Sequence, residues 1–358
     1  MTSAIRLEIP LQKKITSYLN IAYPMLFILS EPKLENWFYE RFVHIYSQQW
    51  YGYYLRTDYA DSSRYFGDLL ERHAHSIEET RAIVQRQSII SFLRSAITEG
   101  YAVNVFTLDK YYLPETEEYH REHLVHELLV TGFDDRTEKF DLIGYKRNGQ
   151  FGEFTTGYAS FEQAFERGLA DAPEVLKESL QLMKRRPLRR EYRFDPGSFV
   201  RELEKLVYSL PDHGKLYFSL ADESEAAFGF QVKEGILEQM RRKVNGERAD
   251  LVNYTAFHFI AEHSELLMDR LLFVRNYVKP DGKLSAMMES YATVHNDYKK
   301  LRLLFLRHAM SETGFNSRFN IRDKQAFSSL HQMLERIVSE EKALLIDIHA
   351  GLNRICKP

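Results

Sequence analysis

The densest group of side chains able to do chemistry lies at His120-Arg121-Glu122-His123-Leu124-Val125-His126. Imidazole groups exchange protons near neutral pH and also bind metals, so both uses have to be weighed. Three histidines at a spacing of three could hold zinc. However, neither a CxxC pair nor an HExxH sequence accompanies them, and this period does not align on one face of a strand. We therefore expect no metal site here.

His126 is the histidine best placed for acid–base catalysis. It opens an apolar run, Leu128-Leu129-Val130, which is expected to form a strand and to hold the imidazole rigidly beside a cleft. A lone histidine in such a position is more often structural than catalytic. A surface loop explains His120 well and His123 less well.

Hydrophobic periodicity predicts the elements that position these residues. Helices are predicted over residues 18–29, 37–46 and 76–99, followed by strands over 101–107, 127–133, 139–145 and 150–155. Helices followed by consecutive strands indicate an α+β domain with an antiparallel sheet. Five further helical segments, at 198–210, 226–244, 251–277, 283–310 and 323–354, indicate an α-helical bundle. The expected division is a first domain over 1–160, a connecting helix and basic linker over 161–197, and the bundle over 198–358.

Composition excludes several classes of partner. The 358 residues carry 48 basic and 51 acidic side chains, so the chain lacks the basic excess of a general nucleic-acid binder. The single cysteine, Cys356, rules out a disulfide within the chain and fits a reducing compartment. The longest apolar run, residues 21–29, is too short for a membrane span, and no signal peptide is evident. A cytoplasmic location without a membrane partner is expected.

Two motifs resemble a known family. Val105-Phe106-Thr107-Leu108-Asp109-Lys110-Tyr111-Tyr112-Leu113-Pro114 is followed by His126-Glu127-Leu128-Leu129-Val130-Thr131-Gly132-Phe133-Asp134-Asp135. Together they resemble the N-terminal domain of butirosin biosynthesis protein H, which is papain-like and related to double-glycine leader peptidases. The resemblance covers residues 1–160. It implies a role in nonribosomal peptide or polyketide biosynthesis, in which an acyl or peptidyl group leaves a carrier-protein thioester.

The resemblance also implies a nucleophile position, and there this sequence departs from its relatives. They carry a cysteine before an aromatic-aromatic-N-x-hydrophobic-aromatic-P run. The corresponding run here is Ser17-Tyr18-Leu19-Asn20-Ile21-Ala22-Tyr23-Pro24, so Ser17 stands in the place of the cysteine. Ser17 could be an ordinary helix N-cap, a nucleophile activated by His126, or an engineered replacement of a native cysteine.

The other implied site residues match less closely. Gln12 would be the oxyanion donor, five residues before Ser17 instead of the customary six. The group that orients the histidine is expected near Gly144, which can orient nothing, and Asp141 is the nearest carboxylate. The candidate substrate contacts are Asn20, Asp109, Tyr111 and Tyr112. Asp109 could equally form a turn, and the two tyrosines could equally be core residues.

The expected reaction follows from these roles. His126 would deprotonate Ser17, the oxygen would attack the thioester, and an acceptor amine would resolve the acyl-enzyme. No bound cofactor is expected, because the phosphopantetheine arm arrives as part of the substrate. The partners would be an acyl- or peptidyl-carrier protein and a small-molecule or peptide acceptor. The basic run 184–193 could contact such an acidic carrier or be only a solvated surface.

Two other functions stay open. The chain could be a catalytically inert papain-like scaffold that binds a carrier domain or a peptide. The serine at position 17 and the missing orienting group near Gly144 favour this alternative. A peptidase is less favoured, because an amide is harder to cleave than a thioester and a full triad is not evident.

Overall fold

The computed structural model describes residues 4–50, 54–60, 66–174, 176–212, 226–247, 254–313 and 323–356. It divides the chain into two compact units, one of residues 1–32 and 65–190 and the other of residues 33–64 and 191–358. The mixed α+β class with antiparallel sheets and a C-terminal helical region is as predicted. The expected limits at 160 and 197 differ from these bounds. Residues 33–64 belong with the helical unit, and residues 161–190 belong with the first unit.

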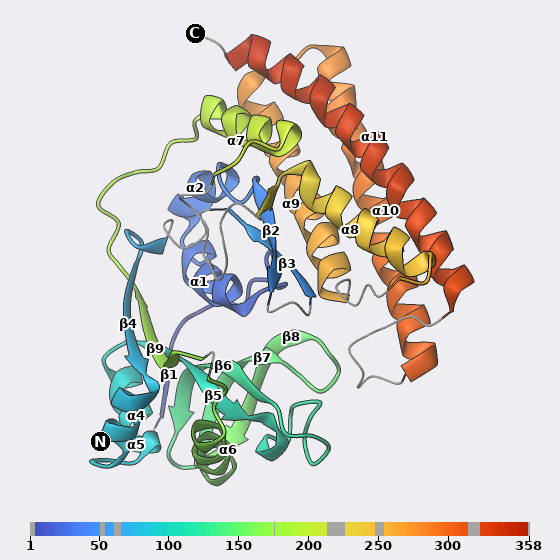
Figure 1. Ribbon diagram of the computed structural model, residues 1–358. Coiled ribbons are helices and arrows are strands. Elements are labelled where there is room, and N and C mark those ends of the chain that lie inside the picture. Colours follow the sequence, from blue (N-terminus) through green and yellow to red (C-terminus); the bar gives the residue numbers. More distant parts are fainter. Residues whose placement is uncertain are drawn as a thin grey trace. The chain divides into compact units, whose positions relative to one another are not determined.

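The first unit is built on a seven-stranded antiparallel sheet (Figure 1). Its strand order is β4-β9-β5-β6-β7-β8, and β1 pairs with β6. The strands are β1 (Ala4–Arg6), β4 (Leu70–Ser76), β5 (Ala102–Asp109), β6 (Val125–Asp134), β7 (Lys139–Tyr145), β8 (Phe151–Gly157) and β9 (Glu178–Arg185). The helices are α1 (Leu19–Leu29), α4 (Ile77–Val84), α5 (Ile89–Thr98) and α6 (Tyr158–Ala170), with a 3₁₀ turn η2 (Lys110–Tyr112) after β5.

Strand alternation gives this sheet two distinct faces. Leu108, Leu128 and Leu142 lie on one face and share a core cluster with α5 and α6. We call this the α6 face. On the opposite face, which we call the α1 face, the Tyr23 ring of α1 lies against Phe151 with ring centroids 6.2 Å apart, and Phe151 pairs with Tyr145. Each face is therefore covered by helix.

Two predictions in the first unit need correction. The helix predicted over 76–99 is two helices, because Ser88 accepts a hydrogen bond from the Ser91 N–H at 3.2 Å and starts a new one. Gly100, at φ +87°, ends α5 as expected of a helix C-cap glycine. Residues 178–185, expected within the connecting segment and basic linker, form β9, which pairs with both β4 and β5.

The second unit is mainly helical. Its helices are α2 (Glu35–Tyr39), α7 (Pro196–Tyr208), α8 (Phe230–Val244), α9 (Tyr254–Val278), α10 (Gly282–Thr313) and α11 (Lys324–Cys356). A 3₁₀ turn, η1 (Pro32–Leu34), precedes α2, and a small sheet joins β10 (Ala227–Phe228), β2 (Ile45–Trp50) and β3 (Tyr54–Tyr59). The helix predicted over 37–46 ends early, since Phe42 adopts a left-handed φ of 59° before β2 begins. Within the described ranges, none of the helices combines the length and apolar character that a membrane span requires.

A buried ionic cluster lies in the core of the second unit. The Lys233 ammonium contacts a carboxylate oxygen of Glu341 at 2.6 Å, and both side chains are fully buried. The hydroxyls of Tyr291 and Tyr298 donate to the same carboxylate at 2.5 and 2.6 Å. Burial lowers the pKa of Lys233. The carboxylate therefore satisfies three buried donors at once.

We expect Glu341→Leu to destabilise the second unit strongly. The change leaves the Lys233 charge and two tyrosine hydroxyls without an acceptor, which should cost about 3–5 kcal/mol. Glu340→Leu is the matched control, because Glu340 is exposed and pairs with exposed Arg336 at 3.2 Å, a contact worth about 0–1 kcal/mol. Urea denaturation of both variants measures the difference. Equal stabilities would contradict the assignment.

Candidate functional site

The predicted site residues lie in the first unit, mostly at one end of its sheet. At this sheet end, β5 and β7 finish and β6 begins, because Asp109 pairs with Val125 and Leu129 pairs with Ile143. The Tyr145 hydroxyl donates a hydrogen bond to the Thr16 carbonyl at 2.5 Å. This contact anchors the residue before Ser17 at the same sheet end. The fold therefore gathers segments that are far apart in the sequence.

Ser17 is half-buried and lies immediately before the N-cap of α1. The N-cap residue is Tyr18, so Ser17 is not the cap, and α1 begins without a side-chain cap. The first N–H groups of a helix lack intrahelical acceptors and point outward. In the first turn, the Asn20 Nδ2 is buried and has no hydrogen-bond partner within the described residues. Gln12 is half-buried in the irregular segment between β1 and α1.

His126 is the second residue of β6, and its side chain is half-buried. It pairs with Leu108, so strand alternation places its imidazole on the α6 face. Burial, with a smaller contribution from the Lys110 ammonium, lowers the pKa of His126 to about 3. The imidazole is therefore neutral at physiological pH. Tyr145 alternates with Ile143 on the α1 face, so the register does not bring His126 to the face on which Thr16 is anchored.

The expected orienting groups do not reach His126. Asp141 pairs with Gly132, which is six residues beyond His126 on β6 and therefore about 20 Å away at 3.3 Å per residue. That separation is too large for Asp141 to orient the imidazole. Burial raises the pKa of Asp141, and Arg6 opposes this shift. A Cβ on Gly144 would lie 2.2 Å from the Leu128 Cδ2, so Leu128 fills the place expected for an orienting side chain.

A different histidine at this sheet end is oriented by a carboxylate. The His123 Nδ1 lies 2.6 Å from the Asp109 Oδ2. Asp109 is 1% exposed, and its Oδ1 accepts hydrogen bonds from the N–H groups of Tyr111 and Leu124 at 3.1 and 3.3 Å. The His123 side chain is 57% exposed and stacks on Tyr111, with ring centroids 4.2 Å apart. A rigid carboxylate thus holds an accessible imidazole.

The sequence contained a signal for this pair. Asp109 ends one strand, and His123 comes just before the next strand, so antiparallel pairing of the two brings them together. The two residues lie fourteen positions apart in different segments, so no short local motif contains both of them. Of the predicted substrate contacts, Asp109 and Tyr111 therefore hold His123. Tyr112 packs its ring against the core cluster of the α6 face.

One buried cation lies beside these groups. Lys110 is 4% exposed, and its Nζ lies 4.0 Å from a Glu118 oxygen. Burial lowers the pKa of Lys110, while Glu118 and Glu127 raise it. Glu127 in turn accepts a hydrogen bond from the Asn104 amide at 2.6 Å. The sheet end is therefore polar and internally paired.

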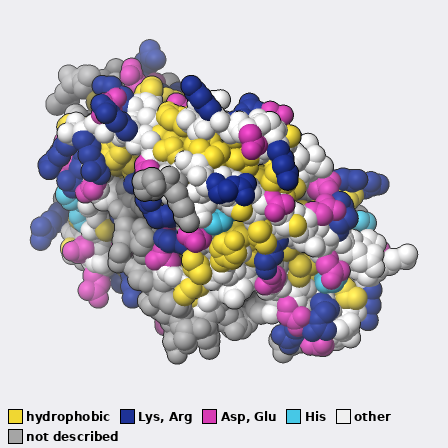
Figure 2. Space-filling model, turned by 90° about the horizontal axis from the view of Figure 1, so that it is seen from above, with side chains coloured by type: hydrophobic (Ala, Val, Ile, Leu, Met, Phe, Trp, Pro, Cys, Tyr) yellow, Lys and Arg dark blue, Asp and Glu magenta, His cyan; other side chains and the backbone are white. Residues whose placement is uncertain are grey.

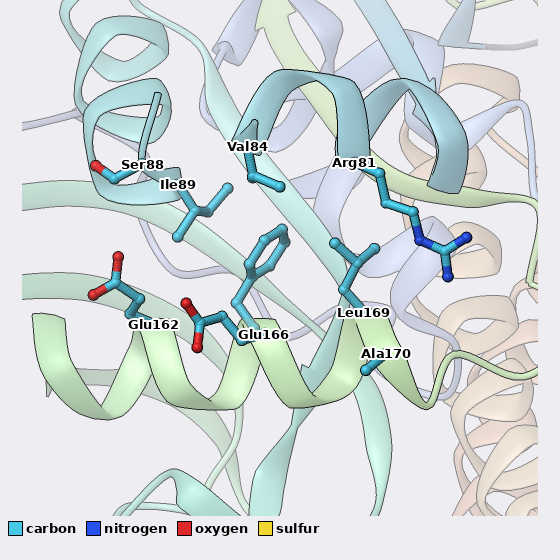
Figure 3. A pocket seen from close by; sticks show the side chains of 9 residues that line it. Arg81, Val84, Ser88, Ile89, Glu162, Glu166, Leu169 and Ala170 are labelled. Carbon is cyan, nitrogen blue, oxygen red and sulfur yellow. The ribbon is translucent and has the colours of Figure 1, made fainter. Parts of the chain in front are cut away.

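A pocket of about 320 Å³ lies elsewhere in the first unit, between α6 and the helices α4 and α5 (Figure 3). Val84, Ile89 and Leu169 contribute to its apolar lining. In the view shown, Glu162 and Glu166 lie toward one end and Arg81 toward the other. None of the predicted site residues lines this pocket, so it is separate from the sheet end.

The basic run is partly used inside the first unit. Lys184 donates to the Glu99 carbonyl at 2.7 Å, and Arg185 pairs with Glu31 at 3.2 Å. Figure 2 shows acidic and basic side chains interspersed over the visible face, with hydrophobic side chains between them. The charge pattern therefore does not by itself identify a docking surface for an acidic carrier.

We expect His126 to stay neutral down to about pH 4, because burial disfavours its charged form. Its pKa is about 3 in the folded chain against about 6.5 unfolded. As the pH falls, the unfolded state therefore takes up the proton first. The free energy of unfolding that the lowered pKa of His126 provides is fully present above pH 6.5 and is lost as the pH falls toward 3. Nitrogen-15 NMR of the imidazole measures the titration. A titration midpoint near 6.5 would contradict the burial of His126. In the His126→Gln variant, the free energy of unfolding should fall less steeply between pH 6.5 and pH 3 than in the parent chain.

Neither the arrangement of possible metal ligands nor the comparison with known proteins identifies a function for this chain. Among the residues the structure describes, no group of three histidine, cysteine or carboxylate side chains is arranged to hold a metal ion. No protein-family model matches the chain, and no curated protein matches it significantly. The sheet end and the two motifs are therefore the features that bear on function.

Proposed function

We propose that this chain takes part in the transfer of an acyl or peptidyl group from a carrier-protein thioester, with Ser17 as the residue that holds the group. The observation that carries the proposal is the start of α1. There, Ser17 stands next to a helix N-terminus without a side-chain cap and next to the unpartnered Asn20 amide. These donors suit the oxyanion of a tetrahedral intermediate. The substrate class, a carrier-protein thioester, is taken from the resemblance of the motifs at residues 105–114 and 126–135.

The chemistry at Ser17 would run in two steps. The Ser17 oxygen attacks the thioester carbonyl, the new C–O bond forms, and the C–S bond breaks as the phosphopantetheine thiol leaves with the proton. An acceptor amine then attacks the acyl group, and the Ser17 oxygen regains a proton. The first N–H groups of α1 and the Asn20 amide would hold the oxyanion in both steps, with Gln12 as a further proposed donor.

His126 is poorly suited to act as the base expected for this reaction. A conjugate acid with a pKa of about 3 makes a neutral imidazole a poor proton acceptor at pH 7. The pairing of His126 with Leu108 also turns it toward the α6 face. These observations favour the second candidate function, an inert papain-like scaffold that binds a carrier domain or a peptide. A cytoplasmic location, where Cys356 stays reduced, suits both functions.

Intact-protein mass spectrometry with acyl-N-acetylcysteamine thioesters tests the transferase. We expect an acyl adduct on Ser17→Cys, a weaker one on the parent chain, and none on Ser17→Ala, because a thiol is the more reactive nucleophile. Ser30→Cys is the matched control. It places a thiol at the other end of α1, where the helix dipole disfavours a thiolate, so it should stay unmodified.

The same experiment separates the two functions. Adducts on Ser17→Cys but not on Ser30→Cys support acyl transfer at the start of α1. If none of the variants is acylated by any of several thioesters, the transferase is wrong. Saturable binding of a carrier protein to the same unmodified chain, measured by calorimetry, would then support the scaffold.

A further inference from the structure

The carboxylate–imidazole pair at the sheet end has the geometry of an acid–base unit. The Asp109 Oδ2 lies 2.6 Å from the His123 Nδ1, and two backbone N–H groups fix the other carboxylate oxygen. This arrangement selects the tautomer with the proton on Nδ1 and leaves Nε2 as the acceptor. Because the side chain is 57% exposed, a substrate group can reach that nitrogen.

The register places the Asp109 side chain on the same face of the sheet as Tyr145. Asp109 pairs with Val125, whereas the preceding residue, Leu108, pairs with His126. The Asp109 side chain therefore lies on the α1 face, together with Tyr145, which anchors Thr16. A further link is the hydrogen bond from the Arg147 N–H to the Glu115 carbonyl, which ties the segment after β5 to the end of β7 at 2.7 Å.

We propose that His123, positioned by Asp109, is the proton acceptor of this site in place of His126. The inference rests on the proposed acyl transfer at Ser17 and names its base. As an acceptor amine attacks the acyl carbonyl, the C–N bond forms and the His123 Nε2 takes the amine proton. The C–O bond to Ser17 then breaks, and the imidazolium returns the proton to the Ser17 oxygen. The acceptor class is a neutral primary amine, whose proton must be removed during attack.

The neighbouring histidines provide controls. His126 lies on the α6 face, and burial keeps it neutral. His120 stacks on Tyr119 and tilts against Tyr111, with ring centroids 4.0 and 5.3 Å away. Neither has the contact to Asp109 that distinguishes His123. His120→Gln and His123→Gln are therefore matched substitutions on one exposed segment.

The first experiment measures release of the acyl group. The Ser17→Cys chain is loaded with an acyl-N-acetylcysteamine thioester, freed of reagent, and mixed with ethanolamine. Intact mass spectrometry then follows loss of the adduct. We expect His123→Gln to slow release by about 100-fold or more, as removal of a general base does, while loading still occurs. His120→Gln should release at the parent rate. An equal rate in His123→Gln would overturn the proposal.

A tautomer measurement separates positioning by Asp109 from a merely structural role. In the parent chain, nitrogen-15 NMR should place the His123 proton on Nδ1. Asp109→Asn offers an amide N–H at the same place and should move the proton to Nε2, slowing release although the chain stays folded. An unchanged tautomer in that variant would contradict the positioning role.

The last arm applies if Ser17→Cys does not load, which would refute the transferase itself. Hydrolysis of p-nitrophenyl acetate by Ser17→Ala protein then tests His123 alone, since the imidazole can accept a proton from attacking water without Ser17. Loss of this hydrolysis in Ser17→Ala/His123→Gln, but not in Ser17→Ala/His120→Gln, supports His123 as a base. The same rate in all three proteins overturns it.

Discussion

A β-bulge in β5 determines which face of the sheet carries each polar group at the sheet end. Val105 pairs with Leu128 but Leu108 pairs with His126, so β5 has one more residue than β6 over this stretch. A one-residue shift moves every later side chain to the other face. Without the bulge, Asp109 would lie on the α6 face. With it, Asp109 shares the α1 face with Tyr145, while His126 faces the core beneath α6.

This division gives the two imidazoles different surroundings. His126 is desolvated and lies near the buried Lys110 ammonium, and both effects disfavour a second positive charge. His123 is exposed, and a carboxylate lies 2.6 Å from its Nδ1. An imidazole that must accept a proton during a reaction needs its charged form stabilised. The surroundings of His126 oppose that stabilisation, whereas His123 is exposed and its Nδ1 is held by the Asp109 carboxylate.

Much of the fold could be predicted from the sequence, because the spacing of hydrophobic residues alone identifies α1, the strands β5 to β8 and the long C-terminal helices. The bulge could not be predicted, since nothing in the run Val105-Phe106-Thr107-Leu108 indicates where pairing shifts. The same limit affects the site. The resemblance led to Asp141 as the carboxylate nearest to the expected orienting position, and only the register shows that it lies too far from His126. β9 was missed because its basic residues suggested an exposed linker.

The serine at position 17 makes the choice of base decisive. A cysteine has an appreciable thiolate fraction near neutral pH, so a weak base beside it can suffice, whereas a serine hydroxyl must lose its proton during attack. A chain with Ser17 and only His126 would therefore be a poor transferase, and the scaffold would be the simpler explanation. The pair of Asp109 and His123 removes that objection, because it supplies an oriented and exposed proton acceptor at the same sheet end. Whether the chain is an enzyme or a scaffold thus depends mainly on the imidazole of His123.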